Sequence, residues 1–233
     1  NWGDYPQMPE AHPVDMLDLD GSFYAIWAPF ELNSGSYFRT NRVDKLTGTE
    51  LWYSTVSMGQ AHQGALSMDM NSNGDLYLTG YQGQASNFVP ANWAVAKISG
   101  ATGELIFHER ITLDSTQEDD LSWGKGACVI GDQPFFVGEL QTSNGSLSNT
   151  GPQSTPYLVK VDPMNGAVER MSAFGGAYRF PSRTVGMEMA PDGHMVVLRQ
   201  EGLRCAVEKY GPDSTLLWRH TFQKEYMLEG ELM

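Results

Sequence analysis

A short phrase that recurs four times along this 233-residue chain constrains its fold more than any other feature. Each copy joins two apolar segments through a turn made of Gly, Asn, Asp or Thr. The copies cover residues 43–52, 97–107, 160–169 and 208–218. They recur about every 50 to 60 residues, a period typical of propellers and other repeat arrays. The phrase therefore predicts an architecture, whereas it indicates little about chemistry.

Each repeat also contains a second hairpin, which brings its content to four strands. In the second repeat, alternating residues 65–70 lead into the turn Asn71–Gly74 and leave through residues 75–80. The equivalent strand pairs are 14–19 with 22–27, 127–130 with 134–138, and 185–189 with 194–199. Four short antiparallel strands are the content of one propeller blade. We predict an all-β chain, a single β-propeller with four visible blades. Their expected bounds are about 12–60, 61–114, 115–176 and 177–224.

The number of blades raises the question of how the ring closes. Propellers have about four to eight blades, and an open ring would leave strand edges and an apolar core uncovered. Either the four blades close on themselves, with residues 225–233 as a latch strand on the first blade, or the ring is larger. In the second interpretation, which we favour, residues 225–233 begin a further blade and another chain or further sequence completes the ring. A homo- or hetero-oligomer would be one way to do so.

The charge balance narrows the classes of partner. The chain has 28 acidic and 15 basic residues, a net charge of −13, whereas nucleic acids and anionic lipids require a basic face. No run of 18 apolar residues is present, so we expect no membrane insertion. The chain begins at Asn1 without an apolar leader, as a processed or partial chain would. Asn144-Gly145-Ser146 fits a glycosylation acceptor. We expect a secreted or cell-surface protein, extracellular or periplasmic.

Residues 44–52 read Asp-Lys-Leu-Thr-Gly-Thr-Glu-Leu-Trp. This segment resembles the tryptophan-docking repeat of quinoprotein dehydrogenase propellers, in which a Thr-Gly turn places the Trp between neighbouring blades. The resemblance therefore implies a packing role for Trp52. The later copies place Phe107, Arg170 and Trp218 at that position. The wider strand pattern is similar to the propeller repeats of many bacterial secreted and cell-surface proteins.

The resemblance does not extend to a quinone site. Those enzymes hold a quinone, a calcium ion and a catalytic carboxylate in a longer, eight-bladed chain, and the present sequence has no pair of adjacent cysteines. Its two cysteines, Cys128 and Cys205, lie at non-equivalent places of different repeats, and two isolated thiols are favoured over a bridge between blades. We therefore predict no catalytic, cofactor-binding or metal-binding residue.

One segment does have the spacing of a calcium loop. Asp69, Asn71 and Asn73 supply oxygen ligands at positions 1, 3 and 5, and Gly74 follows at position 6. The bidentate acid expected at position 12 is replaced by Gly80, so calcium would be held weakly there. An ordinary hairpin turn explains the same residues. We accordingly predict no cofactor, with Ca²⁺ as the one weak candidate.

Other candidate residues are scattered. The five histidines are dispersed without ligand-like pairs, and the acidic cluster Glu118–Asp120 reads as a solvated loop. Four aromatic residues could stack on sugars, although packing between blades is the favoured interpretation. They are Tyr37, Tyr81, Phe88 and Trp93.

The contrast between regular blades and irregular loops suggests a function. Loops at Pro29–Tyr37, Tyr81–Asn92 and Gln141–Pro156 are rich in Ser, Asn and Gly, which offer adaptable hydrogen bonds on a rigid platform. We predict a non-enzymatic binding or scaffold propeller that engages a protein or a glycan through these loops.

Two alternatives stay open. One is a structural subunit of a larger extracellular assembly. The other is a propeller enzyme of quinoprotein, lyase or hydrolase type that uses the central channel. The enzyme would require Asp15, Asp69 and Glu188 to converge with a histidine around a metal.

Overall fold

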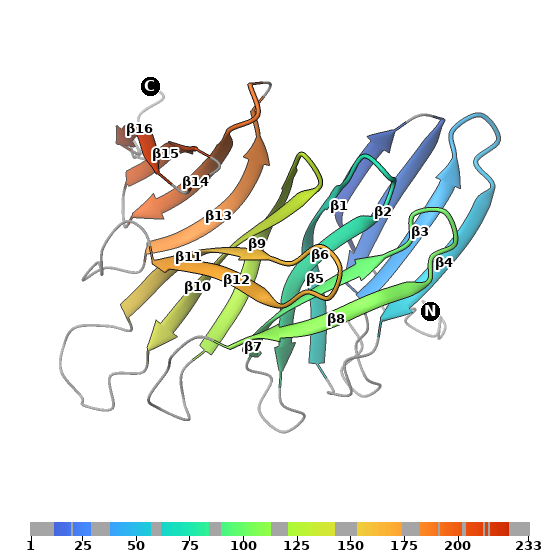
Figure 1. Cartoon of the computed structure of the whole chain (residues 1–233), viewed down its shortest axis with the longest axis horizontal. Coiled ribbons are helices and arrows are strands. Elements are labelled where there is room, and N and C mark those ends of the chain that lie inside the picture. The colour runs from blue at the N-terminus through green and yellow to red at the C-terminus, as the bar shows by residue number, and fades with distance from the viewer. Residues whose placement is uncertain are drawn as a thin grey trace, which may run out of the picture.

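The structure is a computed structural model (Figure 1), and the part of the chain that it describes consists entirely of strands and short connections, without a helix. The described residues are 12–19, 21–28, 38–56, 62–83, 90–112, 121–142, 153–173, 182–190, 192–201, 204–211, 213 and 215–223. Within them there is accordingly no helix of a length and apolarity that could cross a membrane.

In the described part of the chain, sixteen strands form four sheets, and each sheet is one propeller blade in which consecutive strands pair antiparallel. Blade 1 contains β1 (His12–Leu19), β2 (Ser22–Ala28), β3 (Phe38–Asp44) and β4 (Glu50–Val56). Blade 2 contains β5 (His62–Met70), β6 (Leu76–Gly83), β7 (Pro90–Ile98) and β8 (Leu105–Ile111). Blade 3 contains β9 (Leu121–Ile130), β10 (Gln133–Thr142), β11 (Gln153–Val161) and β12 (Val168–Ala173). Blade 4 contains β13 (Ser182–Met189), β14 (Met195–Glu201), β15 (Arg204–Tyr210) and β16 (Leu216–Gln223).

The four sheets confirm the predicted all-β propeller blades, with differences at the strand ends. β6 continues to Gly83 and β7 begins at Pro90, so pairing extends into the segment expected as the loop Tyr81–Asn92. β10 and β11 similarly shorten the expected loop Gln141–Pro156 from both sides. Backbone hydrogen bonding overrides the polar composition of these segments. The loop Pro29–Tyr37, the Glu118–Asp120 cluster, Asn144 and the tail 225–233 lie outside the described residues.

The first strands of successive blades lie next to one another, because β1 contacts β5, β5 contacts β9 and β9 contacts β13. Each blade therefore has two faces. We call the face turned to the next blade in the chain its trailing face and the face turned to the preceding blade its leading face. Alternation along a strand sends successive side chains to opposite faces, so every strand contributes to two interfaces.

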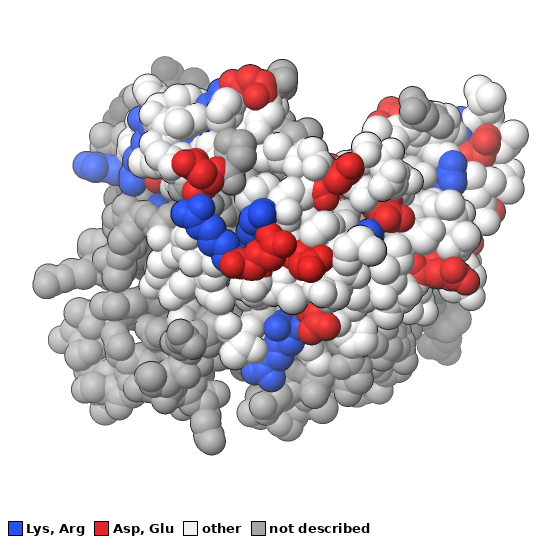
Figure 2. Space-filling view, viewed as in Figure 1, with Lys and Arg blue, Asp and Glu red and all other residues white. Residues whose placement is uncertain are grey.

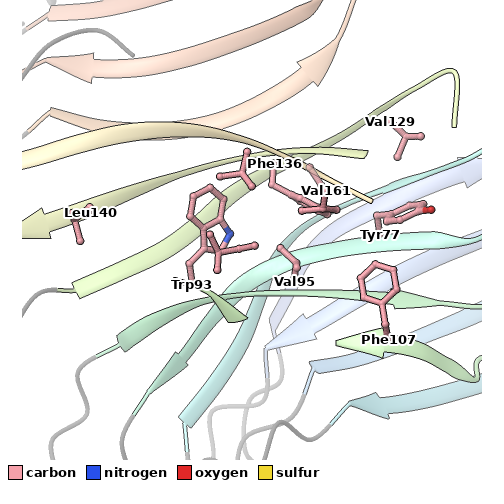
Figure 3. Close-up of a cluster of buried hydrophobic side chains, with 11 residues drawn as sticks. Tyr77, Trp93, Val95, Phe107, Val129, Phe136, Leu140 and Val161 are labelled. Atoms are coloured by element: carbon pink, nitrogen blue, oxygen red, sulfur yellow. The ribbon is translucent and has the colours of Figure 1, made fainter. Parts of the chain in front are cut away.

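Apolar side chains fill the three spaces between consecutive blades. The space between blades 2 and 3 contains Trp93 and Tyr77 from blade 2 and Phe136 from blade 3, all fully buried (Figure 3). Tyr24 and Ile26 of blade 1 meet Leu78 of blade 2 in the second cluster, and blades 3 and 4 share the third. The hydrophobic core thus lies between sheets, which fixes the angle between blades.

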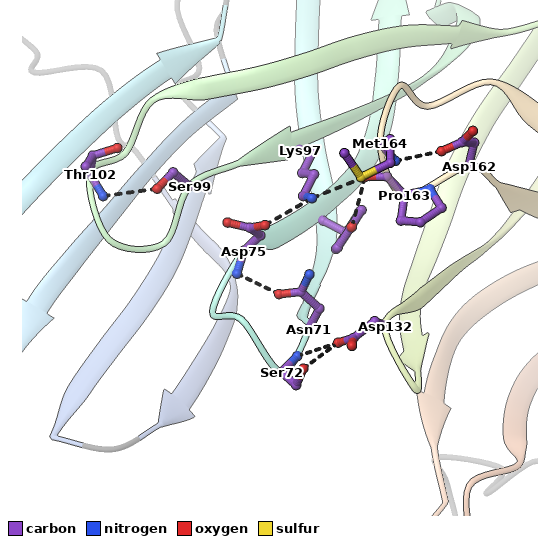
Figure 4. Close-up of polar contacts among 11 residues, drawn as sticks. Asn71, Ser72, Asp75, Lys97, Ser99, Thr102, Asp132, Asp162, Pro163 and Met164 are labelled. Atoms are coloured by element: carbon purple, nitrogen blue, oxygen red, sulfur yellow. Dashed lines mark hydrogen bonds and ion pairs between the residues drawn. The ribbon is translucent and has the colours of Figure 1, made fainter.

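Polar contacts between turns reinforce the packing of blades 2 and 3 (Figure 4). The hydroxyl and backbone N–H of Ser72 both donate to Asp132 Oδ1, at 2.7 and 2.9 Å. Lys97 Nζ lies 3.0 Å from Asp75 Oδ2 and donates to the carbonyl of Pro163 at 3.1 Å. Neighbouring blades are therefore joined at their turns as well as through the apolar core.

The four blades form an arc in which blades 1 and 4 are the two ends (Figure 1). None of the three clusters combines side chains from blade 1 with side chains from blade 4. The space-filling view shows a notch between these two end blades along one edge of the molecule (Figure 2). Within the described residues, the leading face of blade 1 and the trailing face of blade 4 have no blade packed against them.

Candidate functional site: the exposed end faces

The buried interfaces share one arrangement, in which a side chain on the fourth strand of a blade reaches the turn between the third and fourth strands of the next blade. We call this side chain the docking residue and this turn the outer turn. Trp52 on β4 donates its indole N–H to the carbonyl of Gly100 at 3.0 Å. Its ring lies against Gly103, where an added Cβ would come within 2.8 Å of Trp52 Cε3. Gly103 has a φ of +77°, which leaves its face open to the ring. The outer turn of blade 2 thus receives a tryptophan of blade 1, and we call an outer turn with this geometry a seat.

The following blades repeat the arrangement with other residues. Phe107 on β8 lies against Gly166, where an added Cβ would come within 2.6 Å of the ring. Arg170 on β12 acts electrostatically on Asp213 in the outer turn of blade 4, where its charge helps to lower the pKa of the carboxyl, after the bonds from Thr215. A side chain at this position therefore contacts the next outer turn in the first two interfaces and acts on it electrostatically in the third.

A cation beside the docking residue supports the same contact. Arg42 pairs with Trp52 across β3 and β4, and Lys97 pairs with Phe107 across β7 and β8. Arg42 donates to the carbonyl of Gly100 at 3.3 Å, as Lys97 donates to the equivalent carbonyl of Pro163. The docking residue and the cation paired with it thus form a docking row, which brings an aromatic ring and a hydrogen-bond donor to one outer turn.

Blade 4 presents this row on its exposed trailing face. Lys209 pairs with Trp218 across β15 and β16, in the register that Arg42 and Trp52 have in blade 1. Trp218 is 45% exposed, and no described outer turn lies against its ring. Phe222 on the same strand is 49% exposed. The trailing face of blade 4 is therefore an apolar surface without an occupant among the described residues.

Blade 1 has the complementary part of this arrangement, an open outer turn, on its exposed leading face. Met16 is 59% exposed, whereas Met68 and Met187 at the equivalent positions of blades 2 and 4 are 3% exposed. Tyr53 across the sheet is 62% exposed. The outer turn of blade 1 contains Gly48, with φ +69° and no heavy atom within 4 Å of an added Cβ. This turn has the geometry of a seat, but none of the side chains that the structure describes occupies it.

Asp15 and Asp69, on the first strands of blades 1 and 2, join neighbouring blades through hydrogen bonds. Asp15 Oδ2 accepts from Met68 N–H at 2.9 Å, and Asp69 Oδ2 accepts from Val129 N–H at 2.7 Å. The second oxygen of each carboxylate accepts the N–H of the following residue at 2.8 Å. Each carboxylate therefore links the first strands of two neighbouring blades through backbone hydrogen bonds.

Burial modifies the acidity of this inner region. Burial raises the pKa of Asp69, and the nearby charge of Asp15 adds to the rise. Partial burial, with the charges of Asp15 and Asp69, raises the pKa of Glu188. Burial raises the pKa of the Cys128 thiol, which keeps it protonated. The three acids that the enzyme alternative required thus act on one another electrostatically.

They do not form a metal centre in the described part of the chain, where no three His, Cys, Asp or Glu side chains are grouped to hold an ion. In the turn with the calcium-loop spacing, Asn71 Oδ1 accepts the N–H of Asp75 at 2.8 Å, as in a hairpin turn. Lys97 occupies one oxygen of Asp75. The prediction of no cofactor, with calcium at this turn as the one weak candidate, stays open for metal analysis to test.

Other sequence candidates have ordinary surroundings. Trp93 is fully buried and donates its indole N–H to Thr79 Oγ1 at 2.7 Å, so it packs between blades as the favoured interpretation expects. Tyr81 is half-buried, while Tyr37 and Phe88 lie outside the described residues. The thiols of Cys128 and Cys205 are both free; the first is buried and the second half-buried. Of the described histidine side chains, His220 stacks edge-on against Phe222 with ring centroids 4.5 Å apart.

Sequence reasoning missed the exposed end faces. It identified the docking motif at residues 44–52 but assigned it only a packing role. The available signal was the asymmetry of the array: the last docking position has a Trp and the first outer turn has a Gly, and neither has a neighbouring blade among the described residues.

The comparisons with known proteins support the fold. No protein-family model matches the sequence, and no curated protein matches it. The quinohemoprotein alcohol dehydrogenase of Comamonas testosteroni is similar in structure, with a TM-score of 0.52 at 10% identity, over 91% of this chain and 35% of that chain. The calcium-binding protein regucalcin of Agrobacterium tumefaciens matches with a TM-score of 0.45 at 14% identity, over 86% of this chain and 57% of that chain.

A GH93 α-L-arabinofuranosidase of Fusarium graminearum matches with a TM-score of 0.46 at 8% identity, over 87% of this chain and 72% of that chain. The dehydrogenase, whose TM-score is above 0.5, and the four four-stranded antiparallel sheets together support a fold of the β-propeller type. The chain spans little more than half of regucalcin and about a third of the dehydrogenase. At these identities the likeness concerns the fold alone.

Proposed function

We propose that the chain is a binding or scaffold propeller that engages a protein partner through its two end faces. The observation that supports this most is the exposure of large apolar side chains on the two end faces, where Met16 occupies a position that is buried as Met68 in blade 2. Met16, Tyr53 and Trp218 are 59%, 62% and 45% exposed. Apolar surface concentrated in this way is typical of protein interaction sites.

The inner carboxylates support a structural role more than a catalytic one. Both oxygens of Asp15 and of Asp69 accept backbone N–H groups from two blades. These bonds engage two of the roughly four lone-pair sites of each carboxylate in joining blades. The enzyme alternative therefore receives less support than binding.

A glycan partner at the loops is the competing form of the proposal, and site-directed photo-crosslinking separates the two. A benzophenone amino acid is introduced at the position of Tyr53 or of Trp218 and irradiated in the native setting. A third variant carries it at Met164, which is 77% exposed in the outer turn of blade 3. We expect a protein adduct from the two end-face positions and none from Met164.

Equal crosslinking at all three positions would indicate accidental contact, and the absence of a protein adduct at both end faces would overturn the proposal. Capture of glycans on an array by the wild-type chain, undiminished by Tyr53→Ser and Trp218→Ser, would transfer the binding role to the loops.

A further inference from the structure

The two end faces are complementary halves of the arrangement that joins the blades inside the chain. The trailing face of blade 4 ends in an exposed Trp218 with Lys209 beside it, and the leading face of blade 1 ends in an open Gly48 turn. Inside the chain the same two halves meet as Trp52 with Arg42 on the turn that contains Gly103. Within the described residues, a seat without an occupant and an occupant without a seat thus lie at the two ends of the array.

We propose that two copies of this chain join head to tail into an eight-bladed ring, in which Trp218 of each copy docks on the Thr47–Gly48 turn of the other. This inference rests on the proposed function and names its partner. The Trp218 indole and the Lys209 ammonium donate to the carbonyl of Lys45, which is equivalent to that of Gly100. Lys209 already contacts Asp192 in the preceding hairpin turn, as Lys97 contacts Asp75 while it donates to the next blade.

The rest of the two faces is suited to form a fourth kind of apolar cluster. On blade 1, Met16 occupies the position of the buried Met68, and Ala25 occupies that of the buried Leu78. On blade 4, Val196 occupies the position of Tyr24 and Tyr77 in the filled interfaces. Part of each end face therefore carries apolar counterparts of residues that fill the existing spaces, while Asn41 and Arg39 of blade 1 stand where blade 2 has the buried Ala96 and Ala94.

A second copy is favoured over an unrelated partner because a single partner must supply both halves at once. A head-to-tail contact between identical chains forms a closed ring when the rotations add up to a full turn. Two four-bladed copies give eight blades, within the range of about four to eight that propellers adopt. The ring contains two identical docking interfaces and leaves no blade face exposed, which removes the edge that an open array presents.

Sedimentation velocity and light scattering on the purified chain test the inference directly. We expect a particle of twice 25.8 kDa, whose dissociation constant rises at least tenfold on Trp218→Ala. Leu216→Ala is the matched control, because Leu216 is 48% exposed in the same strand but pairs with Tyr210, which faces blade 3. A monomer at all concentrations, or equal effects of the two substitutions, would overturn the inference.

A second variant tests the seat without removing an apolar side chain. Gly48→Asn keeps a residue that tolerates the left-handed conformation but fills the space over the turn, and we expect it to weaken association at least tenfold. Gly74→Asn is the control, because Gly74 also has a positive φ and no heavy atom near an added Cβ, within an array where its interface is already formed.

Mixing the two defective variants provides the sharpest test. In a mixed pair, Trp218 from the Gly48→Asn copy meets the unaltered turn of the Trp218→Ala copy, which restores one of the two interfaces. We expect mixed dimers under conditions in which each variant alone is monomeric. Failure to form mixed dimers would overturn the head-to-tail arrangement. A monomeric chain whose end faces crosslink to another protein would overturn the second copy and leave the proposed function standing.

Discussion

The interface between blades 1 and 2 and the two end faces use the same positions of the repeat with opposite results. Met68 is 3% exposed in the interface, whereas Met16 is 59% exposed on the end face. Gly103 holds the Trp52 ring, whereas nothing lies within 4 Å of a Cβ added at Gly48. The residue types are alike, and the difference is the neighbour. Burial in a repeat protein is thus decided by what stands next to a blade, and blades 1 and 4 each retain an interface surface that no other described blade covers.

The largest expected effect contrasts two tryptophans. Trp93 is fully buried and links blades 2 and 3, since its backbone N–H donates to Ser122 Oγ at 2.9 Å. Trp93→Ala should lower the free energy of unfolding by about 3 to 5 kcal/mol, because it leaves a cavity in the core. Trp218→Ala should change it by less than about 1 kcal/mol. Urea titrations followed by circular dichroism, at concentrations low enough to keep chains separate, measure both, and equal losses would contradict the comparison.

A buried ion pair on the leading face of blade 4 should give the next largest effect. Arg199 Nη1 lies 3.2 Å from Glu208 Oε1, and both side chains are almost fully buried. Glu208→Gln should cost about 3 to 5 kcal/mol, because it removes the negative charge from beside a buried guanidinium. Glu169→Gln removes the partner of Lys160, where both side chains are about a third exposed, and should cost about 0 to 1 kcal/mol. Equal unfolding midpoints for these two variants would show that burial does not decide the difference.

The repeat pattern predicted the blades because local information determines them. Alternation sets the strands, and glycines such as Gly48 and Gly166 mark the turns where φ is positive. The roles of Asp15 and Arg170 could not be predicted in this way. Their partners, Met68 and Asp213, are more than 40 residues distant and belong to another blade. Which face of a strand meets that blade depends on the packing of whole sheets, which the alternation of one strand does not specify.

The third prediction compares the two equivalent turns directly. Gly103→Ala and Gly48→Ala both place a side chain at a φ near +70° to +80°, which costs about 1 to 2 kcal/mol in each. Only at Gly103 does the added Cβ also meet the Trp52 ring, which should cost about 1 to 3 kcal/mol more. Thermal or urea unfolding of the two variants measures this difference. Trp52→Ala and the double variant Gly103→Ala with Trp52→Ala serve as the control pair. The extra loss of unfolding free energy caused by Gly103→Ala should disappear when the Trp52 ring is absent.

The smallest effect concerns the exposed ion pair beside Trp218. A hydrogen bond from Lys209 lowers the pKa of Asp192 to about 2, against partial desolvation. Because this folded-state pKa lies below the usual value of 3.8, the pair adds stability that is fully present above that value. The added stability is lost as the pH falls through the folded pKa. The stability difference between wild type and Asp192→Asn should therefore be constant near neutral pH and shrink towards zero as the pH approaches 2.

Unfolding midpoints measured across this acid range test the sign, since a difference that grew on acidification would contradict the assignment to Lys209. In a Lys209→Met background the pH dependence of the Asp192→Asn effect should largely vanish. Salt sharpens the comparison between covered and uncovered faces. Exposed pairs are screened strongly by salt, and buried pairs much less. The Lys209–Asp192 effect should therefore be salt-sensitive in separate chains and become less so at concentrations where a second copy covers the trailing face of blade 4.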